Sequence, residues 1–198
     1  MVQINKEHKS EIPAFAGQFL LPLRENALLP WERIRQLYEL TFEERGYYRF
    51  GAATGIPVAE FPDLAELGRA HGLKSEIFVI RMNSGFKTPV HVDGHPGRRN
   101  SASLIWPLIG CDGDSPTEWF TVDQPVFELI NNCYFLKSGE TRSLHTACMH
   151  SSRRAPYLFR SDIFHRGFNR TPELRVVVKW EMDCENWEEA VRQAAPWI

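Results

Sequence analysis

The chain has 198 residues, of which 43% are hydrophobic and 24% are charged, as in ordinary globular proteins. This length fits a single domain, and the composition excludes a fibrous or largely disordered chain. The formal net charge of −2 argues against a general nucleic-acid-binding surface. No apolar run reaches the roughly 18 residues of a transmembrane helix. The N-terminal segment also lacks the apolar stretch of a signal peptide, so we expect a cytoplasmic protein without a membrane partner.

Helical spacing of apolar residues predicts two helices in the first third of the chain, at 30–45 and 62–71. A third helix is expected at 186–195, where Asn186 can cap the first turn. The four cysteines include no CxxC pair, which argues against a zinc ribbon or a disulfide framework.

From residue 75 onward, short apolar runs alternate with turn residues, a spacing typical of an antiparallel sandwich or barrel, including the jelly roll. The predicted strands are 76–83, 89–93, 101–109, 117–122, 126–129, 134–136, 157–160 and 175–182. We therefore expect a single domain of three parts: an N-terminal helical region (1–74), a β-rich core (75–182) and a C-terminal helix (183–198).

The segment 88–94 carries the densest chemical signal. His91 and Asp93 stand two residues apart on a predicted strand end, so their side chains point to the same face. An imidazole and a carboxylate are two of the three ligands in the two-histidine, one-carboxylate face of non-haem Fe(II) oxygenases. His165, in a predicted loop bordered by strands, is the best candidate for the third ligand. Three protein ligands would leave three open positions on octahedral iron.

Arg175 begins the apolar strand 175–182, ten residues after His165. An arginine that enters a buried strand is costly without an anionic partner, and its planar guanidinium suits a carboxylate. The sequence therefore offers a metal-binding face and, at a suitable distance along the chain, a carboxylate-binding residue.

With these residues, the chain resembles the Fe(II)/2-oxoglutarate-dependent dioxygenase superfamily over roughly residues 75–182. That family has His-x-Asp, a distal His and an Arg about ten residues later, which correspond here to His91, Asp93, His165 and Arg175. The resemblance implies a mainly β fold with flanking helices around a double-stranded β-helix (jelly-roll, cupin-like) core. It also implies that Fe(II) is held by the first three residues and that Arg175 binds the distal carboxylate of 2-oxoglutarate.

The implied reaction is hydroxylation of a C–H bond with release of succinate and CO2, in a prolyl- or an aspartyl/asparaginyl-hydroxylase-like branch. Many family members place a serine two residues after the arginine, where this chain has Val177. A hydroxyl partner for the carboxylate must then come from another strand, and we assign Ser103 to this role. The other candidates are Ser101, Tyr134 and Tyr157.

The substrate is expected to be a small molecule or a peptidyl side chain, with an anionic group as one option. Residues 81–110 carry four basic residues against one acidic residue, and 137–175 carry eight against three, so the proposed site lies in two basic blocks. Arg98 and Arg99 could contact an anionic substrate or simply be solvated, and Trp106 could contact substrate or pack in the barrel core.

Two alternatives stay open at this point. The first is a cupin-type metalloenzyme that does not use 2-oxoglutarate, in which Arg175 would have no role. The second is a non-catalytic metal-binding sensor that kept the barrel and lost turnover.

Overall fold

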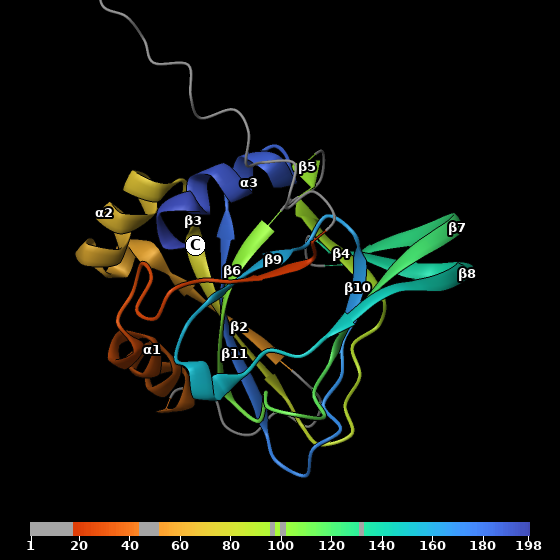
Figure 1. The fold of residues 1–198 in the computed structure, drawn as a ribbon, viewed down its shortest axis with the longest axis horizontal. Coiled ribbons are helices and arrows are strands. Elements are labelled where there is room, and N and C mark those ends of the chain that lie inside the picture. Colours follow the sequence, from red (N-terminus) through yellow and green to blue (C-terminus); the bar gives the residue numbers. More distant parts are fainter. Residues whose placement is uncertain (1–17, 44–51, 96–97, 100–101, 131–132) are drawn as a thin grey trace, which may run out of the picture.

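In the described part of the chain, two antiparallel sheets face each other, and three helices cover the outer face of the larger sheet (Figure 1). The structure is a computed structural model that describes residues 18–43, 52–95, 98–99, 102–130 and 133–198. The helices are α1 (Trp31–Glu43), α2 (Pro62–His71) and α3 (Trp187–Ala194), and short 3-10 turns lie at Val58–Glu60, Ser151–Arg153 and Ala195–Trp197.

The larger sheet has six described strands and lies between the helices and the smaller sheet. In spatial order they are β1 (Leu20–Pro22), β9 (Tyr157–Arg160), β6 (Ala102–Ile109), β11 (Arg175–Met182), β3 (Leu73–Met82) and β2 (Ala52–Pro57). β11 pairs with β6 on one side and with β3 on the other, so it is a central strand whose backbone groups are paired along both edges.

The smaller sheet carries the strands that bring distant histidines together. Its order is β10 (Phe164–Gly167), β7 (Thr117–Ile130), β8 (Cys133–Ala147), β4 (His91–His95) and β5 (Arg98–Arg99), with a further pairing of β10 and β4. β10 therefore lies between β7 and β4, because His165 is opposite Trp119 on one side and His91 on the other. The long β7–β8 hairpin extends beyond the rest of the sheet (Figure 1).

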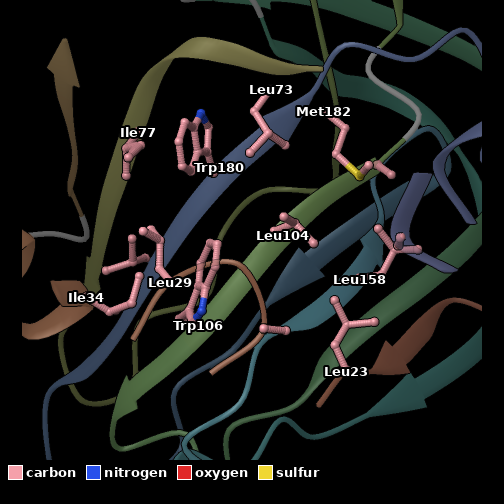
Figure 2. Close-up of a cluster of buried hydrophobic side chains, with 14 of the residues drawn as sticks. Leu23, Leu29, Ile34, Leu73, Ile77, Leu104, Trp106, Leu158, Trp180 and Met182 are labelled. Carbon is pink, nitrogen blue, oxygen red and sulfur yellow. The ribbon is translucent and has the colours of Figure 1, made fainter. Parts of the chain in front are cut away.

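The main hydrophobic core lies between the larger sheet and the helices. Trp106, Trp180 and Leu104 pack there with Ile34 of α1 and Trp187 of α3. Figure 2 shows Trp106 and Trp180 within this cluster, and both are at most 1% exposed. Burial of such large apolar side chains is the main force that holds the sheet and helices together.

Successive residues of β11 point to opposite faces, as expected for a strand. Val176, Val178 and Trp180 enter the main core. Val177, one position along, belongs to a second cluster between the two sheets, with Trp119 and Phe159. Odd-numbered residues of β11 therefore face the space between the sheets, where the smaller sheet presents its own side chains.

The predicted fold class, mainly β with a jelly-roll core and flanking helices, is confirmed. α2, β9 and β11 have the predicted bounds, and Asn186 accepts a hydrogen bond from the amide of Glu189 at the start of α3. For the helix predicted at 30–45, the described part runs from Trp31 to Glu43, and residues 44 and 45 lie outside the described residues.

Three features differ from the prediction. Strand β2 of the N-terminal region, which pairs with β3 in the larger sheet, was not predicted, so this region is not helical alone. The predicted strands 117–122 and 126–129 are one strand, β7, of 14 residues. It pairs with β8, of 15 residues, which the sequence predicted only at 134–136. The predicted loop around His165 is strand β10.

In the part of the chain that the structure describes, no helix is both long enough and apolar enough to cross a bilayer.

Candidate metal centre

His91 and Asp93 project from β4 into the space between the sheets. Asp93 is 4% exposed, and His91 is partly buried. The Nδ1 atom of His91 lies 2.8 Å from the carbonyl oxygen of Pro89. Because a carbonyl only accepts, this contact places the ring proton on Nδ1 and leaves the Nε2 lone pair free. That Nε2 atom is 3.7 Å from Oδ1 of Asp93.

His165 reaches the same point from β10. Its Nδ1 atom donates to the carbonyl oxygen of Ile163 at 2.8 Å, so its Nε2 lone pair is also free. Nε2 lies 3.8 Å from Oδ2 of Asp93, and one ligand atom from each of His91, Asp93 and His165 lies within 4.8 Å of the other two. The predicted triad is therefore brought together, with donor atoms of the types that a divalent metal binds.

The electrostatics of the site keep His165 and Asp93 in their ligating forms. Burial is the main reason that the pKa of His165 falls to about 3, so the ring is neutral at physiological pH. Burial alone would raise the pKa of Asp93, but the ammonium of Lys179, and then the two histidines, outweigh it, and the net pKa lies well below its usual range. A neutral imidazole and an ionised carboxylate are what metal ligation requires.

Lys179, which the sequence reasoning missed, is part of this centre. Its Nζ atom donates to Oδ2 of Asp93 at 2.7 Å and lies 3.0 Å from Oε1 of Glu181. The residue is 7% exposed and sits on the odd-numbered face of β11, four positions after Arg175. Strand alternation from Arg175 was the signal that could have identified it, since residues 175, 177 and 179 share one face.

Arg175 is 3% exposed and has incomplete hydrogen bonding. Nη1 donates to the carbonyl oxygens of Phe168 at 3.1 Å and Pro116 at 3.4 Å, and Nη2 donates to Oγ1 of Thr117 at 3.4 Å. The buried Nε atom has no hydrogen-bond partner, and among the described residues no carboxylate pairs with this guanidinium. A buried guanidinium in this condition has the capacity to bind an anion.

The guanidinium lies close to the triad along β10. A Cβ atom on Gly167 would stand 3.3 Å from Nη1 of Arg175, so this glycine leaves room for the arginine. Gly167 is two residues from His165 and on the same face of β10, a separation of roughly 7 Å at the usual rise of a strand. The structure therefore places a cation beside the triad, as the spacing of His165 and Arg175 suggested.

Ser103 lies too far from Arg175 for the two residues to bind the same carboxylate. The register pairs Ser103 with Glu181, six positions along β11 from Arg175, which is roughly 20 Å along the strand. Its assignment as the second carboxylate partner is therefore wrong on geometric grounds, although its buried Oγ atom is unpartnered. The hydroxyl beside Arg175 is that of Thr117, at the start of β7, which the sequence reasoning did not consider.

Trp106 is also corrected by the structure. It pairs with Val178 on the even-numbered face of β11, so its indole packs in the main core (Figure 2). The triad lies on the other side of the larger sheet, with Lys179. It is therefore a core residue and contacts no ligand at the centre. The side chains of Arg98 and Arg99 lie outside the described residues, while their backbone forms β5 beside β4.

Aromatic rings line the histidines. The ring of Phe159 is 4.9 Å from that of His165, and the ring of Phe135 is 5.5 Å from that of His91, measured between centroids. Phe127 of the hairpin stacks on Phe164 with centroids 5.7 Å apart, but Phe164 precedes His165 in β10, so this pair lies on the other face of the smaller sheet. Phe159 and Phe135 therefore give the triad its apolar neighbours.

No protein-family model and no curated protein sequence matches this chain. Among solved structures, the chain is similar to a prolyl-4-hydroxylase from Pseudomonas putida, with 14% identity and a TM-score of 0.51 over 86% of this chain and 95% of that one. A vicilin from Solanum melongena matches at 10% identity and a TM-score of 0.43, over 73% of this chain and 31% of that one.

A variant of Bacillus subtilis oxalate decarboxylase matches at 11% identity and a TM-score of 0.41, over 74% of this chain and 29% of that one. The chain thus spans about a third of the vicilin and of the decarboxylase. At these identities the similarity concerns the fold alone, and the prolyl-4-hydroxylase supports a jelly-roll assignment for nearly the whole chain.

Proposed function

We propose that this protein is an Fe(II)- and 2-oxoglutarate-dependent oxygenase that hydroxylates a C–H bond of a small or peptidyl substrate, with release of succinate and CO2. The observation that carries the proposal is the buried guanidinium of Arg175, whose Nε atom is unpartnered and which lies beside a group of two histidines and one carboxylate. A metal site alone would not explain why a guanidinium with an unpartnered Nε atom is buried beside the triad.

The residues present fit both groups. His91, Asp93 and His165 would hold iron, since their two free Nε2 atoms and one ionised carboxylate converge. Iron would supply the redox chemistry that couples oxygen to the oxidative decarboxylation of 2-oxoglutarate and to substrate oxidation. Arg175 would bind the distal carboxylate of 2-oxoglutarate, and the Thr117 hydroxyl would donate to the same carboxylate.

The apolar side chains between the sheets have a separate role in the proposal. Val177, Trp119 and Phe159 form a buried cluster next to the triad and the arginine. They would exclude bulk water from the bound cosubstrate, which strengthens its pairing with Arg175 and suppresses side reactions.

Anaerobic binding of 2-oxoglutarate to the Mn²⁺-loaded protein tests the proposal, followed by an oxygen-dependent assay of succinate release with Fe(II). Arg175→Met removes the guanidinium, and Arg192→Met, at an exposed position of α3, is the matched control. Loss of a charge-assisted contact of about 2 kcal/mol predicts a roughly 30-fold weaker Kd for 2-oxoglutarate in Arg175→Met.

The other outcomes separate the alternatives. Metal binding at the triad without any affinity for 2-oxoglutarate would refute the proposal and favour a cupin-type metalloenzyme. Binding of both ligands without succinate release for any substrate would favour the non-catalytic sensor.

A further inference from the structure

A row of alternating charges leads from the protein surface to the carboxylate of the triad. Lys74 Nζ is 3.2 Å from Glu181 Oε2, Glu181 Oε1 is 3.0 Å from Lys179 Nζ, and Lys179 donates to Oδ2 of Asp93 at 2.7 Å. Lys179 also lies 5.9 Å from the centroid of the Phe78 ring. A buried ammonium destabilises the fold unless anionic groups are paired with it, and Lys179 has two such partners, Asp93 and Glu181.

The two oxygens of Asp93 are in different environments. Oδ2 accepts a short, charge-assisted hydrogen bond from Lys179, which occupies one of its lone pairs and polarises it. Oδ1 faces Nε2 of His91 at 3.7 Å, and its other neighbour is the thiol of Cys133, a weak donor at 3.8 Å. Oδ1 is therefore the oxygen that is free to ligate.

The number of ligating oxygens decides what else a metal can hold at this site. Two histidines and one carboxylate oxygen leave three positions open on a six-coordinate ion. If both oxygens of Asp93 ligated, two positions would remain, and a chelating cosubstrate would fill them.

We propose that Lys179 is a positioning residue that keeps Asp93 a one-oxygen ligand and so preserves an open position on the metal beside a chelating cosubstrate. The identity of that metal and cosubstrate rests on the function proposed above. Lys179 touches neither of them in this role and acts through Asp93 alone. β11 holds the ammonium in place, because its backbone is paired with β6 and β3 on both sides.

This role predicts that Lys179 lowers the affinity of the site for a metal ion. The ammonium repels a divalent cation, so Lys179 weakens metal binding while it maintains the open position. Lys179→Met should therefore bind metal at least as tightly as the wild type, yet offer fewer positions to other ligands. A lysine with a purely structural role would instead weaken both properties together when it is removed.

The experiment loads the whole protein with Mn²⁺ and counts exchangeable metal-bound water by water-proton relaxation, alongside titrations of Mn²⁺ and then 2-oxoglutarate under nitrogen. We expect Lys179→Met to bind Mn²⁺ with an undiminished affinity, to carry one bound water fewer, and to bind 2-oxoglutarate about tenfold or more weakly. Lys179→Arg, which keeps the positive charge, should restore the water count, and Lys137→Met, at an exposed position of β8, should behave as the wild type.

Lys179→Met could fail to fold because it removes the buried cation that lies between Asp93 and Glu181. The double variant Lys179→Met/Glu181→Gln removes both charges together, keeps the net charge of the region and gives the same expected water count. An unchanged water count in a folded variant would overturn this inference and leave the proposed function intact. A parallel loss of Mn²⁺ and 2-oxoglutarate affinity would also overturn it, as a structural effect. A wild-type protein that binds Mn²⁺ with three waters but never binds 2-oxoglutarate would refute the proposed function alone.

Discussion

The effect of Arg175→Met on thermal stability distinguishes two roles of this residue, ligand binding and structural support. The two side chains are similar in volume, so the substitution removes the charge and the donors without leaving a large cavity. In the ligand-free protein the guanidinium is 3% exposed and its Nε atom has no partner. Its Nη atoms donate to two backbone carbonyls and one hydroxyl, at 3.1 to 3.4 Å, and the thiol of Cys111 is a further, weak partner.

The magnitude follows from these contacts. The substitution loses one good hydrogen bond from a charged donor, to Phe168, at a cost of about 1.5–3 kcal/mol. It also relieves the desolvation of an unpaired buried charge, a penalty of several kcal/mol per ion. We therefore expect the ligand-free variant to be as stable as the wild type or about 1 kcal/mol more stable, a rise in Tm of roughly 2–4 °C for a chain of this size.

Thermal unfolding of the metal-free protein, followed by circular dichroism with and without 2-oxoglutarate and Mn²⁺, measures this difference. Mn²⁺ should raise the Tm of both proteins, because both keep the triad, whereas further addition of 2-oxoglutarate should raise the Tm of the wild type more than that of Arg175→Met. A structural arginine would behave otherwise, since truncation of one partner of a satisfied buried pair costs about 3–5 kcal/mol. A fall in Tm of more than roughly 6 °C in the ligand-free variant would refute the reasoning.

Three further substitutions test the placement of individual side chains. Thr117→Val should weaken 2-oxoglutarate binding by about fivefold in calorimetric titration, because it removes one neutral hydroxyl beside Arg175, and an unchanged Kd would remove Thr117 from the site. Ser103→Ala should leave that Kd unchanged and raise stability to urea by up to about 1 kcal/mol, because the buried Oγ atom has no partner, so weaker binding would contradict the corrected position. Trp106→Ala should cost about 3–5 kcal/mol of unfolding free energy without changing the affinity of the folded protein for Mn²⁺, and a loss of that affinity would argue against its place in the core.

Much of the fold follows from apolar patterns that any buried strand must show. β9 and β11 are short, apolar and buried on both faces, and both were predicted with their observed bounds. β8 was predicted in part only, because most residues beyond Leu136 are polar and exposed and are held as a strand by their pairing with β7. β10 is four residues long, too short for a pattern to separate it from a loop.

The candidate site was likewise predicted only in part. His91, Asp93, His165 and Arg175 were identified from residue type and spacing, and the structure brings the first three within reach of one ion. Ser103 was misassigned because residue type alone says nothing about register, which decides which hydroxyl lies beside a given strand position. Thr117 and Lys179 were missed for the same reason, since each reaches its partner from a strand that is distant in sequence.

β11 contributes side chains both to the main core and to the candidate site, because its two faces point to opposite sides of the larger sheet. Val176 and Val178 are fully buried in the main core and fix the strand in position. On the other face, Arg175 and Lys179 are four residues apart, roughly 13 Å along the strand, with Lys179 on Asp93 and Arg175 beside the end of β10. A ligand that reaches from the triad to Arg175 therefore passes over Val177, whose side chain has no polar atom that could bind it. A hydroxyl partner for such a ligand beside Arg175 has to come from the opposite sheet, and Thr117 is the residue that the fold places there.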